Sequence, residues 1–242
     1  MANFVNKLQA NSVCKLSGKI SNYQCVRKSA SFVYSKGDQE KFGVVAVAAA
    51  LAGMGGQATA VTASASVLEE EADYVQFCLN GDTVKGWVWR SPFKEGDLVD
   101  VAAEWRGSHY EAYGIARPAD RMIALYPHCS RSRIQHIKNA VKWWFICNLL
   151  FYFFMVALAL SIGIVEMFYR PEFYKIYGPL VLFFIIMFVS LAGKYMPFVR
   201  LSEKVFKILG FPNVKSIDLV KSSKLQRTAD DPGEFGTFYF RY

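Results

Sequence analysis

The sequence predicts an α+β membrane protein, in which a small antiparallel β barrel or sandwich of the OB or SH3-like kind precedes a two-helix transmembrane hairpin. Three observations predict it. Short β-prone runs separated by turn signals fill the first half of the chain. An uncharged Ala/Gly-rich run, at 42–68, interrupts them. Two aromatic-aliphatic runs, at about 143–165 and 176–193, each have the length that a helix needs to cross a hydrocarbon core of about 30 Å.

The net charge indicates which kind of partner the protein binds, and the cysteine content indicates in which cellular compartment it is found. The 242 residues carry a formal net charge of +8, which suits an anionic partner. The basic residues crowd the flanks of the apolar runs and no nucleic-acid motif accompanies them, so we expect lipid headgroups and no nucleic acid. Five cysteines, an odd number without paired spacing, indicate a reducing compartment.

The first half, residues 1–129, is expected to form the β domain. Residues 13–35 have loosely alternating, β-prone patterns. Residues 74–79 and 84–90 flank Asn80-Gly81, which is a strong hairpin signal. The runs 99–105 and 110–115 flank a second turn at Gly107-Ser108, and we expect a last strand at 121–125 to close the sheet.

The insertion at 42–68 admits three interpretations. It could be a third transmembrane pass, a nucleotide-binding loop, or a short helical hairpin of 44–51 against 58–67. The nucleotide loop lacks the βαβ context that its glycine pattern requires, and Ala and Gly give a third pass little transfer free energy. We therefore favour the helical hairpin, and we keep as an alternative that this segment inserts into the membrane. Its close packing would depend on Gly53, Gly55 and Gly56.

Residues 130–196 are expected to form a basic helix that runs into the transmembrane hairpin. Because Lys and Arg flank both runs while the short link between them has no charge excess, both termini are expected on the cytoplasmic side of the membrane. The side chains expected at the membrane surface are Arg131, Arg133, Lys138, Lys142, Trp143, Trp144, Lys194, Arg200, Lys204 and Lys207. Asn148 is expected to hydrogen-bond between the two helices.

Residues 197–242 are expected to hold an amphipathic helix and an aromatic end. The helix, at 199–209, has apolar residues at helical spacing and stops at Gly210 and Pro212. It could lie on the membrane surface or pack on the β domain. The hydrophobicity of 235–242 indicates a docked strand.

Catalytic, cofactor-binding and metal-binding patterns are not found in the sequence, so a non-enzymatic protein is expected. His128, Cys129 and His136 are candidate zinc ligands, but a fourth ligand at suitable spacing is missing. Neither a nucleophile elbow nor a phosphate-binding loop occurs.

Three stretches carry a resemblance to a bacterial family: GWVWRSPFKEGD at 86–97, IALYPHCSR at 123–131 and FYFRY at 238–242. They resemble proteins labelled type VI secretion system effectors, over most of the chain. The resemblance implies a multi-pass protein of a bacterial inner membrane that acts as a membrane-perturbing effector, with an immunity or accessory membrane protein as the alternative. The partners it implies are membrane lipids and a cognate effector, immunity or secretion-apparatus protein. Homo-oligomerisation is left open.

Overall fold

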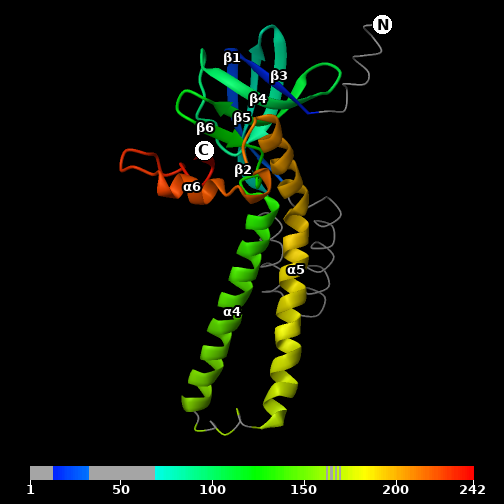
Figure 1. Cartoon of the computed structure of the whole chain (residues 1–242), viewed down its shortest axis with the longest axis vertical. Helices are drawn as coiled ribbons and strands as arrows, with labels where there is room; N and C mark the ends of the chain where they lie inside the picture. The colour runs from blue at the N-terminus through cyan, green and yellow to red at the C-terminus, as the bar shows by residue number, and fades with distance from the viewer. Residues whose placement is uncertain (1–12, 33–68, 162, 164–165, 167, 169) are drawn as a thin grey trace, which may run out of the picture.

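A closed β barrel and a long two-helix hairpin make up the computed structural model of the chain (Figure 1). The structure describes residues 13–32, 69–161, 163, 166, 168 and 170–242. The helical hairpin expected within 42–68, with its packing glycines Gly53, Gly55 and Gly56, lies outside the described residues. So does most of the link between the two helices.

Five strands of the described chain close the barrel. They are β1 (Cys14–Ala30), β2 (Glu70–Leu79), β3 (Asp82–Val88), β4 (Leu98–Trp105) and β5 (Tyr110–Arg117). β1 pairs with β2 and β4, β2 pairs with β3, and β4 pairs with β5, all antiparallel. The expected β barrel is therefore confirmed. β1 is one strand of 17 residues that serves two partners, with a register shift between Ser21 and Gln24.

The closure of the barrel differs from the expectation. Residues 121–125 were expected to close an antiparallel sheet, but the closing pair is β3 with β5, and it is parallel. Gly86 makes this pairing possible, because a Cβ at this position would collide with the backbone oxygen of Ala112. β6 (Met122–Leu125) instead extends the sheet beyond β5, and β7 (Tyr239–Arg241) pairs with β6. The aromatic end thus docks as the short strand expected of it.

Two hydrophobic cores lie on the two sides of β5 and β6. The first fills the barrel with alternate side chains such as Val75, Phe77 and Ile115. The second lies between the outside of the barrel and the end of the second long helix, where Val205 and Phe206 are buried. This second core joins the soluble and apolar halves of the molecule into one folded body.

The two long helices are α4 (Arg133–Ser161) and α5 (Pro171–Ile208). As expected, α4 begins in the basic run and continues through the first apolar run. α5 extends past the base of α4 to lie beside the barrel (Figure 1). The helix expected at 199–209 is present as far as Ile208, but it is not separate from the second apolar run, because α5 continues through Pro197. Of the two packing alternatives, these turns bury their apolar face against the barrel.

The rest of the C-terminal part wraps around the base of the hairpin. A 3-10 turn, η2 (Val214–Ser216), leads into the short helix α6 (Leu219–Leu225). Asp218 caps α6 by accepting a hydrogen bond from the backbone N–H of Lys221. The chain then returns through a loop to β7.

Candidate functional site

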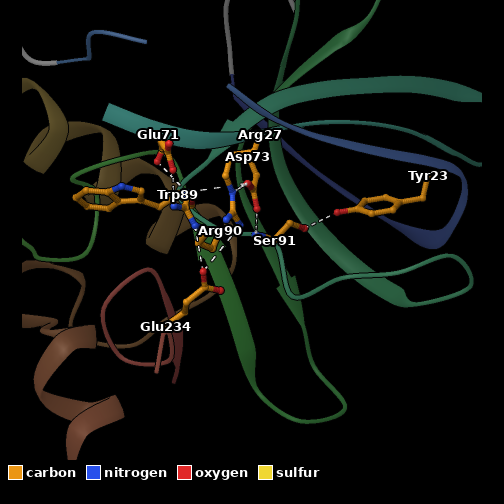
Figure 2. Close-up of polar contacts among 8 residues, drawn as sticks. All are labelled: Tyr23, Arg27, Glu71, Asp73, Trp89, Arg90, Ser91 and Glu234. Atoms are coloured by element: carbon orange, nitrogen blue, oxygen red, sulfur yellow. Dashed lines mark hydrogen bonds and ion pairs between the residues drawn. The ribbon is translucent and has the colours of Figure 1, made fainter. Parts of the chain in front are cut away.

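A cluster of acidic and basic side chains, with Arg90 at its centre, lies where β1, β2 and the end of β3 meet (Figure 2). Arg90 follows β3 and is only 8% exposed. Its Nη1 donates to the backbone oxygens of Glu71 at 2.8 Å and of Trp89 at 2.9 Å. Its Nε donates to Oε1 of Glu234 at 3.3 Å. One guanidinium group therefore ties β2 and the C-terminal segment to the end of β3.

Asp73 is the buried acid of the cluster, at 4% exposure. Its carboxylate accepts a hydrogen bond from Nε of Arg27 at 3.0 Å and another from the backbone N–H of Ser91 at 3.0 Å. Nη1 of Arg90 lies 4.0 Å from the same carboxylate. A buried charge is tolerated when it is paired and hydrogen-bonded in this way. The cluster thus fixes the ends of β1 and β2 that flank the 31–69 connection.

Tyr23 and Ser91 extend the cluster along the barrel wall. Their hydroxyl groups share a hydrogen bond (Figure 2). Burial raises the pKa of the Tyr23 phenol above its ordinary value, and the hydrogen bond with Ser91 opposes part of that rise. Tyr23 therefore stays neutral and acts as a structural hydrogen-bonding group.

Trp89 and His128 form the adjoining aromatic contact. Their ring centroids lie 4.6 Å apart. His128 has a positive φ of 65°, which few non-glycine residues adopt, so this backbone position is held by its surroundings. Nε2 of His128 lies 2.7 Å from a carboxylate oxygen of Glu70, and its ring contacts Tyr195 and Phe198 of α5. His128 thus joins the barrel to the second long helix.

A cavity of about 510 Å³ opens where α4, α5, α6 and the loop before β7 meet; we refer to it as the junction cavity. Residues that characterise its wall are Trp89, His128, Arg131, His136, Trp143 and Lys224. A volume of this size is typical of pockets that accept small organic ligands. Neither Asp nor Glu is among its described lining residues. Its charged groups are therefore basic.

Two of the expected surface residues form ion pairs in the structure. Nε of Arg131 lies 3.3 Å from Oδ1 of Asp218. The backbone N–H of Arg133 donates to Glu203 of α5 at 2.9 Å, and its guanidinium lies 3.6 Å from the same carboxylate. Both arginines therefore help to hold α4 to the C-terminal part.

The other expected surface residues lie along the two helices. Trp143 is exposed and lines the junction cavity. Trp144 has a buried indole N–H for which the described residues provide no acceptor. The basic side chains that are exposed are Lys138, Lys142, Lys194, Arg200, Lys204 and Lys207.

Asn148 forms a hydrogen bond within α4, and none to α5 is found among the described residues. Its side-chain N–H donates to the backbone oxygen of Trp144, one turn earlier in α4, at 2.8 Å. A side-chain amide can satisfy one of its donors on the carbonyl one turn back in the same helix.

The zinc ligands considered from the sequence do not converge. Nε2 of His136 lies 3.1 Å from the backbone oxygen of Ala192, while His128 contacts Glu70. Cys129 is buried, its Sγ lies 3.4 Å from the backbone oxygen of Phe198, and burial raises its pKa above the ordinary value. Within the described ranges, no group of three or more His, Cys, Asp or Glu side chains could hold a metal ion.

The polar cluster around Arg90 and the junction cavity were both missed by sequence reasoning. Their residues come from segments that are far apart in the chain, so no spacing rule connects them. One signal was present: Asp73 interrupts the apolar pattern of β2, and a buried acid needs a basic partner. Comparison with protein-family models, with curated proteins and with solved structures finds no match for this chain.

Proposed function

We propose that the chain is a non-enzymatic integral protein of a bacterial inner membrane, which holds a β barrel against the cytoplasmic surface. The observation that carries the proposal is the uncovered apolar surface of α4 and α5. Large side chains point outward in both helices, and Phe154 and Val189, for example, are 62% and 67% exposed. Both helices are long and apolar enough to cross a membrane. Burial of each such side chain is worth about 1.5–3 kcal/mol, so lipid is the environment that stabilises them.

The distribution of basic residues supports a cytoplasmic barrel. The start of α4 and the last part of α5 lie at the barrel end of the hairpin (Figure 1). Both carry Lys and Arg, including Lys138, Lys142 and Lys204. At the opposite end, Glu166 and Arg170 pair at 3.9 Å, so the positive charge there is balanced. By the positive-inside rule, the barrel end is cytoplasmic.

The barrel has the properties of a binding module. Its pairing order, β1 with β2, β2 with β3, β3 with β5, β5 with β4 and β4 with β1, supports the OB alternative over the SH3-like one. In OB folds, the connection between the first two strands is one of the ligand-binding loops. Here that connection contains the Ala/Gly-rich run at 42–68. We assign recognition of a partner protein to this side of the barrel.

The resemblance to type VI effectors supports a role in bacterial antagonism, as an effector that perturbs the membrane. The joint between barrel and hairpin favours the alternative, a resident immunity or accessory protein. Val205 and Phe206 of α5 are fully buried against the barrel, so the helix folds as part of the soluble module. A protein built in this way suits permanent anchorage.

The membrane arrangement is tested by cysteine labelling in spheroplasts. Cys25 on β1 is exposed, and a Glu166→Cys variant places a thiol at the opposite end of the hairpin. A membrane-impermeant maleimide should label position 166 in intact spheroplasts and Cys25 only after lysis. Labelling of Cys25 in intact spheroplasts would contradict the proposed orientation.

The role in antagonism is tested by expression in a naive bacterium with a potential-sensitive dye. An effector should depolarise the membrane and stop growth. An immunity protein should leave both unchanged and should rescue cells that express the toxin encoded beside it. Normal potential together with no rescue would contradict both roles.

A further inference from the structure

We propose that the junction cavity is a binding site for one anionic phospholipid of the cytoplasmic leaflet, with the lipid phosphate held by Lys224 and Arg131. The inference rests on the proposed membrane location and adds a specific ligand to it. The cavity is lined by the first turns of α4, from His136 to Trp143, and by Trp89 and His128 beside the barrel, so it lies where the membrane surface would meet the barrel. Basic pockets between transmembrane helices on the cytoplasmic side are known to suit anionic lipid headgroups.

The α4 side of the cavity changes from apolar to polar toward the barrel, while the α5 side stays largely apolar. On α4, Trp143 lies two turns deeper in the hairpin than His136, which is a rise of about 10 Å. On α5, Phe188 lies at the deeper end and Val199 toward the barrel, a rise of about 16 Å. Arg131, outside the start of α4, lines the barrel end. Acyl chains would meet the deeper apolar wall and a headgroup would meet the polar one.

The charges at the polar end are complementary to a phosphate diester. Arg131 and Lys224 both line the cavity, and no carboxylate does among the described residues. Arg131 uses Nε for Asp218 at 3.3 Å, so its terminal nitrogens are left to donate. Lys224 is exposed, in the last turn of α6, and its ammonium makes no ion pair within the described part of the chain. An unpaired cation beside a paired one gives the cavity a net positive charge.

Neutral donors complete the polar wall. The side chains of Ser130, Asn139 and Thr237 line the cavity, and each makes no side-chain hydrogen bond within the residues that the structure describes. These groups can donate to phosphate or glycerol oxygens. A free phosphate would use only this polar end, whereas a phospholipid would also cover Trp143 and Phe188. The apolar wall therefore favours the lipid.

The site is tested with the full-length protein purified in a non-ionic detergent. Native mass spectrometry would measure retention of dioleoyl phosphatidylglycerol against phosphatidylcholine with the same chains. The wild-type protein should retain one phosphatidylglycerol molecule in preference. Since one lysine near an anionic lipid surface is worth about a fivefold change in affinity, Lys224→Gln should weaken retention about fivefold and Lys224→Glu about 25-fold.

Lys221→Glu is the matched control. Lys221 lies on the same short helix and is exposed, but it does not line the cavity. Its variant carries the same net charge as Lys224→Glu and should retain the lipid within twofold of wild type. Near-ultraviolet circular dichroism checks that both variants keep the wild-type fold.

Three results would overturn the inference. Equal retention of both lipids would exclude an anionic headgroup site, and equal weakening by the two Glu variants would show a general charge effect. Displacement of the lipid by millimolar inorganic phosphate would make free phosphate the ligand. In each of these cases, the proposed membrane location would still hold if the protein requires detergent for its extraction. A protein that is soluble without detergent overturns that function separately.

Discussion

Replacement of Arg90 by Met should destabilise the barrel more than removal of any exposed arginine. Arg90 is 8% exposed and pairs with a carboxylate, Asp73, that is 4% exposed. Met has a similar apolar reach, so the main loss is the charge and its hydrogen bonds. Removing one partner of a buried ion pair costs about 3–5 kcal/mol.

The other partners of Arg90 add little to this cost, because the carboxylates of Glu71 and Glu234 are largely solvent-accessible. Because Arg27 and the Ser91 amide still hold Asp73, we expect about 3 kcal/mol.

Urea unfolding of the full-length protein in detergent micelles measures this loss. Trp87, Trp89 and Trp105 report on the barrel by their fluorescence. For a domain of this size, the slope of free energy against urea is about 1–3 kcal/mol per molar. A loss of about 3 kcal/mol then lowers the midpoint by about 1.5 M at a slope of about 2 kcal/mol per molar.

Arg106→Met is the matched control for that experiment. Arg106 pairs with Glu104 and Glu111 at the far turn of β4, and its side chain is 46% exposed. Exposed ion pairs are worth about 0–1 kcal/mol, so the midpoint should fall by no more than about 0.5 M. A midpoint for Arg90→Met that equals the one for Arg106→Met would refute the structural role of the cluster.

Three further predictions use the same protein. Gly86→Ala should lower barrel stability by about 1–3 kcal/mol, because the new methyl group would collide with the backbone of β5; a wild-type urea midpoint would contradict it. Cys129 should resist maleimide at pH 7.5 while exposed Cys25 reacts, because burial hides the Cys129 thiol and raises its pKa; equal labelling before unfolding would count against the second core. Hydrogen bonds from the Thr228 amide and hydroxyl, and then the charge of Arg241, hold the pKa of Asp231 below its usual 3.8. The stabilisation by this carboxylate is therefore complete above that value and lost as the pH falls through the lower folded pKa, and hydrogen exchange of the loop between pH 2 and 5 should show the loss.

Much of the fold could be predicted because its signals are local. The Asn80-Gly81 turn and the alternation around it determine the β2–β3 hairpin within about twenty residues. The apolar runs likewise predict α4 and α5 from composition alone. What could not be predicted is the pairing of β3 with β5, since a parallel contact depends on a close backbone approach at Gly86.

The end of α5 was misjudged for a related reason. Pro197, Gly193 and the change from apolar to basic residues indicate a boundary when they are considered locally. The helix continues because tertiary packing compensates: Val205 lies against Gly114 of β5, where a Cβ would meet its Cγ1 at 2.6 Å. The candidate site was harder still, because Arg90, Asp73 and their partners meet only after the barrel has closed.

Alkaline carbonate extraction of membranes from cells that produce the full-length chain shows whether α4 and α5 lie in the bilayer. The extraction strips peripheral proteins, while a hairpin that spans the bilayer stays in it, because its apolar surface has no other favourable environment. We expect the protein to remain in the pellet until detergent is added. Recovery of a folded, monodisperse protein in the carbonate supernatant would contradict it.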